Sequence, residues 1–229
     1  MGDIVIAAHV MQEDARQWPQ CKITWVANEP FAPMLRQMPF IAEVISFRKK
    51  DKLKSILALL HELRQRKFDM VWDLHGLLRP AMFTLLSGVR LRWGIRTNKG
   101  LRGLTYTRWV PPLTNELGRH AMAHSAAFAA CAGLDYALTS NLQLRPSATY
   151  PWQSFFSSDP DKNFVVVTDS SRAFKNWPYF PGLTEKILAA NPAHRVIWCG
   201  GSTLATPAHF PATQFLNLTG MRPMEELVA

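Results

Sequence analysis

The chain has 229 residues, 48% of them hydrophobic, and a formal net charge of +9 at pH 7. This length allows one large domain or two modest ones, because a common domain has roughly 100–150 residues. No apolar run approaches the ~20 residues that a membrane-spanning helix needs, so the composition favours a chain that buries a core. Cys21, Cys131 and Cys199 are scattered without metal-ligand spacing, which argues against a disulfide framework or zinc site and fits a reducing cytoplasm.

The first part of the chain predicts alternating helices and strands. We expect helices over 4–16, 29–37 (interrupted by Pro33), 52–66, 79–86 and 119–132, and strands over 22–27, 43–46, 69–74 and 90–95. The helix over 52–66 has the clearest pattern, because its apolar residues recur at three- and four-residue spacing. This alternation is typical of an α/β domain with a doubly wound parallel sheet and right-handed crossovers.

The pattern starts again after Pro146, Pro151 and Pro160, which mark an expected domain boundary. We expect a strand over 164–168, a helix over 181–190 and a strand over 195–199, and therefore domains over 1–145 and 160–229. The apolar run over 164–167 predicts a strand buried on both faces of a parallel sheet.

Both ends of this pattern are unusual for an α/β protein. A helix comes first, with Asp3 available as its N-cap, where such a domain normally opens with a strand. The second domain is shorter than usual. We therefore expect a first domain that lacks its opening strand, an incomplete second domain, and a chain that is a fragment.

The loop after the strand over 164–168 has the composition of a phosphate site. Ser170 and Ser171 offer hydroxyls, and Arg172 and Lys175 offer positive charge, where an open α/β sheet binds its ligands. Donors and cations together suit a phosphate or diphosphate. The alternative is an ordinary strand-to-helix connection with solvated charges.

A second feature is a basic segment over 74–115, which contains no Asp or Glu. Its cations are Arg79, Arg90, Arg92, Arg96, Lys99, Arg102 and Arg108. Such a segment attracts nucleic acid, phospholipid headgroups or phosphorylated glycans, and charge alone does not choose among them.

Taken in order, several short motifs make the whole chain resemble the lipopolysaccharide heptosyltransferases. These motifs are Gly2-Asp3-Ile4-Val5, FDMVWDLHGLLR over 68–79, Trp93-Gly94-Ile95, Arg119-His120-Ala121, SSRAFKNWP over 170–178, and Cys199-Gly200-Gly201. Each motif is weak alone, and the ordered set is more specific.

The resemblance implies the GT-B architecture, in which two Rossmann-like domains each contribute to the site. It implies an inverting transfer of heptose from ADP-heptose to the inner core of lipopolysaccharide. It also implies no cofactor or metal, no nucleic acid partner, and a cytoplasmic protein peripheral to the inner membrane. The anionic core and lipid A would be the partner of the basic segment.

On the acceptor side, Asp3 matches the carboxylate proposed in that family as the base that deprotonates the acceptor hydroxyl. His75, Arg79, Arg119 and His120 match acceptor-side positions. The alternatives are an N-cap role for Asp3 and an ordinary loop role for His75.

On the donor side, Lys175 matches a lysine that stabilises charge on the departing diphosphate. Ser170 and Ser171 match hydroxyl residues that bond the phosphates. Gly200 and Gly201 would let the backbone approach the nucleotide. The alternative for Lys175 is a solvated loop cation.

Three other functions stay open at this stage. The first is a GT-B glycosyltransferase with another nucleotide sugar, since fold does not determine the donor. A nucleic-acid-binding protein is less favoured, because residues 74–115 contain no recognisable nucleic-acid module. A non-catalytic membrane-surface protein would need an amphipathic helix, and burial explains the leucines of 52–66 more simply.

Overall fold

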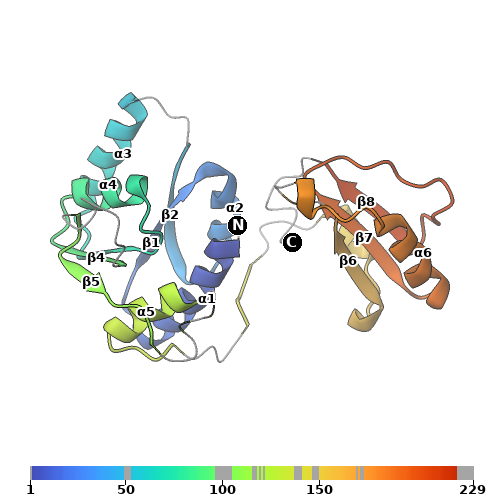
Figure 1. The fold of residues 1–229 in the computed structure, drawn as a ribbon, viewed down its shortest axis with the longest axis horizontal. Coiled ribbons are helices and arrows are strands. Elements are labelled where there is room, and N and C mark those ends of the chain that lie inside the picture. The colour runs from blue at the N-terminus through green and yellow to red at the C-terminus, as the bar shows by residue number, and fades with distance from the viewer. Residues whose placement is uncertain are drawn as a thin grey trace. The chain divides into compact units, whose positions relative to one another are not determined.

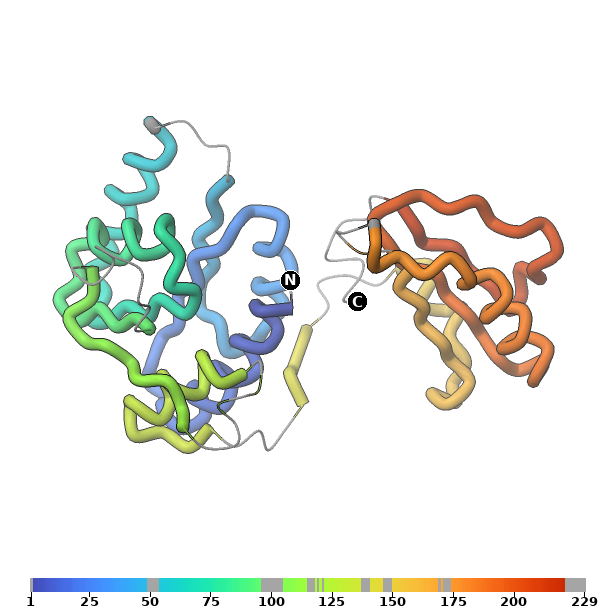
Figure 2. Tube along the Cα trace, in the orientation of Figure 1, coloured from blue at the N-terminus to red at the C-terminus, as the bar shows by residue number. Residues whose placement is uncertain are grey.

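The computed structural model describes residues 2–48, 53–95, 105–114, 118, 120, 122–136, 141–145, 150–168, 170 and 173–220. The chain divides into two compact units, Met1–Gln143 and Leu144–Ala229 (Figures 1 and 2).

In the first unit, helices and strands alternate along the chain. Its elements are α1 (Gly2–Gln17), β1 (Ile23–Asn28), α2 (Ala32–Arg36), β2 (Ile41–Phe47), α3 (Leu53–Gln65), β3 (Met70–Asp73), α4 (Leu78–Leu86), β4 (Leu91–Ile95), β5 (Arg108–Val110) and α5 (Ala123–Cys131). A single 3-10 turn, Glu29–Phe31, joins β1 to α2.

The strands of this unit form two parallel sheets. One sheet pairs β1 with β2, and the other has the order β3-β4-β5. In the second sheet Trp72 lies opposite Trp93, and Asp73 lies opposite Gly94. Every strand pair is parallel, so within each sheet the carboxyl ends of the strands lie at one edge.

Helices α1 and α5 pack together and cover one face of this unit (Figure 1). Val10 and Met11 of α1 join Ala129 of α5 in a buried cluster, against which the tryptophans of β1 and β3 pack. Phe128 of α5 is fully buried against β4 and β5. The run of small residues in α5 allows this close helix-to-sheet approach.

The described residues of the second unit form one three-stranded parallel sheet, β6-β7-β8, and one α-helix. Its elements are β6 (Asn163–Val167), α6 (Phe180–Ala190), β7 (Arg195–Gly200) and β8 (Phe215–Thr219), with 3-10 turns at Pro151–Phe155, Pro160–Lys162 and Ala173–Lys175. The indole of Trp198, in the central strand β7, is 1% exposed and donates a hydrogen bond to Thr184 Oγ1 at 2.8 Å.

The strand over 164–167 is not buried on both faces, so that prediction was wrong. Val165 and Val167 are 57% and 64% exposed, whereas Phe164 and Val166 pack into the core against α6. Among the described strands β6 lies at the sheet edge and pairs only with β7. The apolar run predicted a strand correctly, but it could not tell an edge from a centre.

Two helix details also differ from expectation. Helix α1 begins at Gly2, so Asp3 lies in its first turn and is not the N-cap residue. Pro33 stands in the first turn of α2 and does not interrupt it, because a proline there loses no helical hydrogen bond. The short strands β5 and β8 were not predicted.

We expect Thr184→Val to destabilise the second unit by about 1–3 kcal/mol, because it leaves the buried Trp198 N–H without its acceptor. Urea unfolding combined with hydrogen exchange of the β7 amides would measure the change. Thr184→Ser keeps the hydroxyl and is the matched control. Equal losses in the two variants would show that methyl packing, rather than the hydrogen bond, matters.

Candidate functional site

In the first unit, a buried carboxylate organises the carboxyl end of β3. Asp73 is 4% exposed, and its Oδ1 accepts hydrogen bonds from the backbone N–H groups of His75 and Gly76, each at 3.0 Å. Gly76 has φ 61°, which a residue without a side chain adopts easily. Asp73 therefore has a structural role, because it holds the turn that follows β3.

The other oxygen of Asp73 ties the turn to the neighbouring strand. Tyr106 donates its hydroxyl to Asp73 Oδ2 at 2.5 Å. The Tyr106 ring lies directly over Gly94, where an added Cβ would meet ring carbons at 2.4 Å. Gly94 is therefore glycine because the ring occupies the place of a side chain.

His75 and Arg79 lie exposed beyond this turn. The Arg79 guanidinium sits over the Phe47 ring, 6.0 Å from its centroid, at the end of β2. This edge of the first unit thus presents an imidazole and a cation supported by an aromatic ring.

Asp3 is exposed in the first turn of α1, where the positive end of the helix dipole favours a carboxylate. His120 is exposed just before α5, and its Nδ1 accepts a hydrogen bond from the Met122 N–H at 3.2 Å. That bond leaves Nε2 as the ring nitrogen for other contacts. Arg119 lies outside the described residues.

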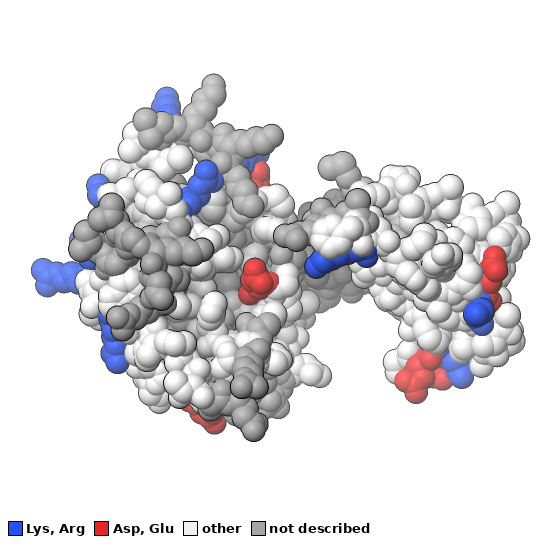
Figure 3. Space-filling view, in the orientation of Figure 1, with Lys and Arg blue, Asp and Glu red and all other residues white. Residues whose placement is uncertain are grey.

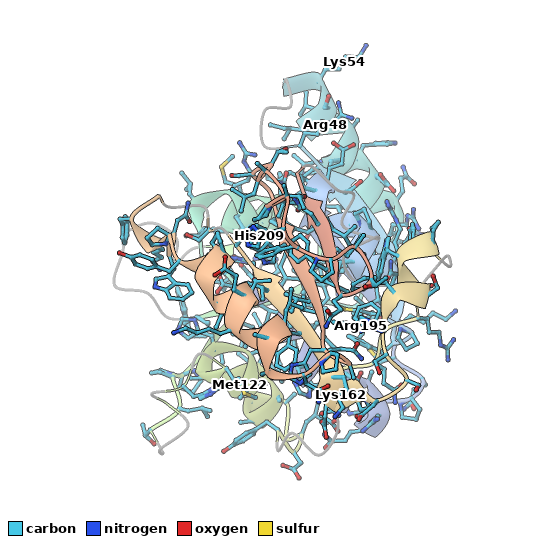
Figure 4. All side chains as sticks on the ribbon, turned by 90° about the vertical axis from the view of Figure 1, so that its right-hand side faces the viewer. Arg48, Lys54, Met122, Lys162, Arg195 and His209 are labelled. Atoms are coloured by element: carbon cyan, nitrogen blue, oxygen red, sulfur yellow. The ribbon has the colours of Figure 1, made fainter. Side chains whose placement is uncertain are left out.

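At the ends of β1 and β2, Arg48 forms an ion pair with Glu29. Its second nitrogen donates to Glu29 Oε1 at 2.9 Å. This contact lowers the pKa of Glu29, chiefly through the hydrogen bond from Arg48. Arg48 is labelled in Figure 4.

The described cations of the basic segment do not form one positive face. Arg92 donates to the carbonyls of Val89 and Thr105, and Arg108 stacks over Trp93 at 4.4 Å. Arg90 precedes β4, at the opposite strand end from Arg79. In the view of Figure 3, blue side chains of this unit are spread around its outline.

A shallow pocket of about 380 Å³ also lies at this opposite end, lined by Arg64, Lys67, Phe68, Asp69, Ser87, Gly88, Val89 and Arg90. Arg64 Nε donates to the Leu86 carbonyl, which belongs to the last turn of α4. Helix carboxyl ends favour cations, so these basic residues need no bound anion to explain them.

In the second unit, the described donor-side residues share the carboxyl edge of its sheet. Thr168 is buried and donates both its N–H and its hydroxyl to the Cys199 carbonyl, at 2.9 and 3.2 Å. The Ser170 N–H donates to Asn176 Oδ1 at 2.8 Å, which closes the loop on itself. Ser171 lies outside the described residues.

Lys175 is exposed at the end of the 3-10 turn Ala173–Lys175. Large apolar side chains surround it in sequence: Phe174 is 78% exposed and Tyr179 is 67% exposed. The Trp177 ring makes edge contacts with the rings of Tyr179 and Phe180, with centroid distances of 5.7 and 5.2 Å, and these contacts link the loop to the start of α6.

Gly200 ends β7, and its carbonyl accepts a hydrogen bond from the Gly220 N–H at 2.9 Å. Gly220 has φ 116°, and a Cβ there would lie 3.1 Å from Thr203 Oγ1. Gly201 follows and is exposed. Ser170 and Lys175 both lie in the connection that follows β6, at the carboxyl end of that strand.

The opposite edge of the same sheet carries different groups. Lys162 and Arg195 lie at the amino ends of β6 and β7 (Figure 4). Lys162 pairs with Asp159 at 3.8 Å, and Arg195 donates to carbonyls of the preceding turn. These cations serve local structure.

Over the described ranges, no three His, Cys, Asp or Glu side chains gather in a way that could hold a metal ion. Within the same residues, no helix has the length and apolar character needed to span a membrane.

Solved structures share this fold of parallel α/β units. A glycosyltransferase family 9 structure from Veillonella parvula matches with a TM-score of 0.73 and 20% identity, over 99% of this chain and 68% of that one. E. coli heptosyltransferase WaaC with ADP-2-deoxy-2-fluoro heptose matches with a TM-score of 0.71 and 19% identity, over 99% of this chain and 75% of that one.

The chain belongs to glycosyltransferase family 9, the heptosyltransferases, whose family model matches residues 56–213. It is 22% identical to the lipopolysaccharide core heptosyltransferase OpsX of Haemophilus influenzae, over 100% of this chain and 68% of that protein. It is 23% identical to lipopolysaccharide heptosyltransferase 1 of Pseudomonas aeruginosa, over 86% of this chain and 58% of that protein.

Sequence reasoning missed two residues that shape these edges, Tyr106 and Asn176. Both act through hydrogen bonds to residues distant along the chain or across a loop, so periodicity could not reveal them. Only the position of Asn176 inside the loop motif hinted at its role.

We expect Gly94→Ala to displace the Tyr106 ring and to destabilise the first unit by more than Tyr106→Phe does. The second variant removes only the hydrogen bond to Asp73, which should cost about 1–3 kcal/mol. Chemical denaturation of both variants, followed by hydrogen exchange in β3 and β4, would measure the two effects. A neutral Gly94→Ala would contradict the packing described here.

Proposed function

We propose that the protein transfers heptose from ADP-heptose to the inner core of lipopolysaccharide, with inversion at the anomeric carbon. Membership of the heptosyltransferase family carries this proposal. The two relatives named above are a lipopolysaccharide core heptosyltransferase and a lipopolysaccharide heptosyltransferase. Because the chain spans 68% and 58% of them, the activity is proposed for the protein that contains these units.

The chemistry is a single displacement. A carboxylate takes the proton of the acceptor hydroxyl, whose oxygen attacks the anomeric carbon while the bond to the diphosphate breaks and ADP leaves with the electron pair. Asp3 is the proposed base, since it is exposed and no described cation pairs with it. Its exposed place in the first turn of α1 leaves this carboxylate accessible to an acceptor hydroxyl.

The donor diphosphate is proposed to bind at the carboxyl edge of β6 and β7. Support comes from the Ser170 loop, which Asn176 closes, and from Lys175, which is exposed nearby. An ammonium there would stabilise the charge that develops on ADP. Gly200 and Gly201 would admit the nucleotide close to the backbone.

The acceptor is proposed to bind the first unit through His75, Arg79, Arg119 and His120. Arg79 is exposed over Phe47, and a guanidinium suits the carboxylates and phosphates of an anionic glycolipid. Peripheral contact with the cytoplasmic face of the inner membrane, and absence of a cofactor or metal, belong to the same proposal.

The direct test is ADP release by the protein with ADP-heptose and deep-core lipopolysaccharide. Heptosylated product seen by mass spectrometry would support the proposal. Equal or faster transfer from another nucleotide sugar would show that ADP-heptose is not the preferred donor. Preference for duplex DNA over lipopolysaccharide in moderate salt would rule out lipopolysaccharide as the acceptor.

We expect Asp3→Asn to lower kcat by roughly 10²–10⁴-fold, because a general base contributes about that much. Binding of ADP-heptose should stay nearly unchanged, since the base acts on the acceptor hydroxyl. Isothermal titration and steady-state rates separate these quantities. Asp161→Asn, an exposed carboxylate at the amino end of β6, is the matched control. Near-normal turnover of Asp3→Asn would show that Asp3 is not the base and only interacts with the helix dipole.

We expect Lys175→Ala to lower kcat by about 10²–10³-fold, and to weaken donor binding by less, because negative charge grows on the leaving diphosphate. Lys175→Arg should recover only part of the rate, since a planar guanidinium places its charge differently. Lys186→Ala, on the exposed side of α6, controls for loss of a surface charge. If Lys175→Ala and Lys175→Arg both keep full rate, Lys175 is a solvated loop cation.

A further inference from the structure

Helix α4 carries an apolar stripe on its exposed side. Leu78, Met82 and Leu85 are 62%, 47% and 42% exposed, and their spacing of four and three residues places them on one face of the helix. The opposite face of the helix is buried through Ala81 and Thr84. The apolar side chains of the first face therefore contact water and take no part in the core.

The residue before the helix extends the same apolar surface. Leu77 is the N-cap of α4, is 56% exposed, and makes no capping hydrogen bond through its side chain. Serine, threonine, aspartate or asparagine at this position would stabilise the helix, and leucine does not. Departures from such local rules are expected at functional positions. We call Leu77, Leu78, Met82 and Leu85 the α4 stripe.

The exposed positions of α3 and α6 differ from those of α4, because they include charged residues. On α6 they include Glu185 and Lys186. On α3 they include Lys54 and Arg64. A helix at a protein surface normally turns such a charged face to water. The α4 stripe has no charge, so its composition suits an apolar medium better than water.

Two cations flank the α4 stripe. Near its amino end, the Arg79 guanidinium is held 6.0 Å from the centroid of the Phe47 ring. At its carboxyl end, the exposed Arg64 donates from Nε to the Leu86 carbonyl at 2.8 Å. The sequence contains no Asp or Glu between residues 74 and 115, so α4 and the strand after it add no opposing carboxylate. Apolar side chains with basic flanks are complementary to anionic lipid headgroups above acyl chains.

The α4 stripe begins beside two residues that are proposed to bind the acceptor. His75 lies two positions before Leu77, and Arg79 directly follows Leu78. An acceptor with a lipid anchor keeps its sugars at the membrane surface, so the residues that bind it must lie at headgroup level. A helix that lies in the interface would hold the residues at its amino end at that level.

The α4 stripe is too small for a stable protein interface, which takes roughly 20–30 residues from each partner. A lipid surface needs no such area, because weak and reversible binding is enough to concentrate an enzyme on a membrane. Even a single acyl chain gives only marginal binding to a bilayer. The size of the stripe therefore favours a bilayer over a second copy of the chain.

We propose that the α4 stripe is a membrane-docking surface for anionic phospholipid bilayers. The helix lies in the plane of the interface, with Met82 and Leu85 towards the acyl chains and with Arg64 and Arg79 at the level of the phosphates. This inference rests on the proposed function for its biological purpose, since it names the surface that makes the peripheral membrane contact. Docking itself requires neither donor nor acceptor.

The test is co-sedimentation of the purified protein with vesicles of phosphatidylglycerol and phosphatidylethanolamine that contain no lipopolysaccharide. We expect an association constant on the order of 10³ M⁻¹ in lipid. Vesicles of neutral phosphatidylcholine should bind at least about fivefold more weakly, because each cation near an anionic surface contributes to binding. Amide hydrogen exchange should slow in α4 and stay unchanged in α6.

The double variant Met82→Gln, Leu85→Gln separates insertion of the stripe from attraction by net charge. Glutamine is a good helix former and both positions are exposed, so thermal stability should change little. Affinity for the anionic vesicles should fall about tenfold or more, because two apolar side chains no longer leave water. The conservative pair Met82→Leu, Leu85→Met should keep the affinity. Leu183→Gln, on the exposed part of α6, is the matched control and should also leave it unchanged.

Three results would overturn the proposal. The first is undiminished vesicle binding by the double glutamine variant, which would show that net charge alone attracts the protein. The second is equal protection of α4 and α6 on vesicles. The third is a dimer, detected by light scattering, that dissociates in the double glutamine variant, which would assign the stripe to a second copy. A protein that docks through α4 and transfers no heptose would contradict the proposed function and support the docking surface.

Discussion

The carboxylate of Asp73 is the contact on which the candidate site of the first unit depends. It ends β3, holds the N–H groups of the following turn, and accepts the hydroxyl of Tyr106 from the next loop. Removing this acceptor leaves the buried Gly76 N–H and Tyr106 hydroxyl unsatisfied, and that cost exceeds the net worth of any one bond. This turn fixes the position of His75 and the point at which α4, which carries Arg79, begins.

In the second unit, uncharged groups hold the carboxyl ends of the strands together. Backbone hydrogen bonds from Thr168 to Cys199, and from Gly220 to Gly200, connect the ends of β6, β7 and β8. The buried indole of Trp198 then attaches α6 to the central strand through Thr184. A loop that carries Ser170 and Lys175 is thereby held on a rigid base, which a phosphate site requires.

Much of this architecture could be predicted from local patterns. The spacing of Leu57, Leu60 and Leu63 predicted α3, and the run Val196-Ile197-Trp198 predicted β7, because their side chains obey the period of the element. The motif around Ser170 and Lys175 placed both at a strand end, as observed.

Two kinds of feature could not be predicted. The exposure of Val165 depends on which strands flank β6, and the Tyr106–Asp73 bond joins residues 33 positions apart. Neither leaves a periodic signal in the sequence. The roles of Asp3 and Lys175 rest on resemblance, since their exposed positions alone suit many functions.

Asp14 of α1 is buried, and its burial makes folding of the first unit a proton-binding reaction. Its ordinary pKa of 3.8 applies in the unfolded chain, and about 7 applies in the folded one. Between these values the folded state holds a proton that the unfolded state has released, so the pH-dependent cost of burying this group is absent below the lower value and grows as pH rises towards the upper. At neutral pH the buffer must therefore supply part of a proton whenever the unit folds, and the heat of folding measured by calorimetry includes the ionisation enthalpy of that buffer.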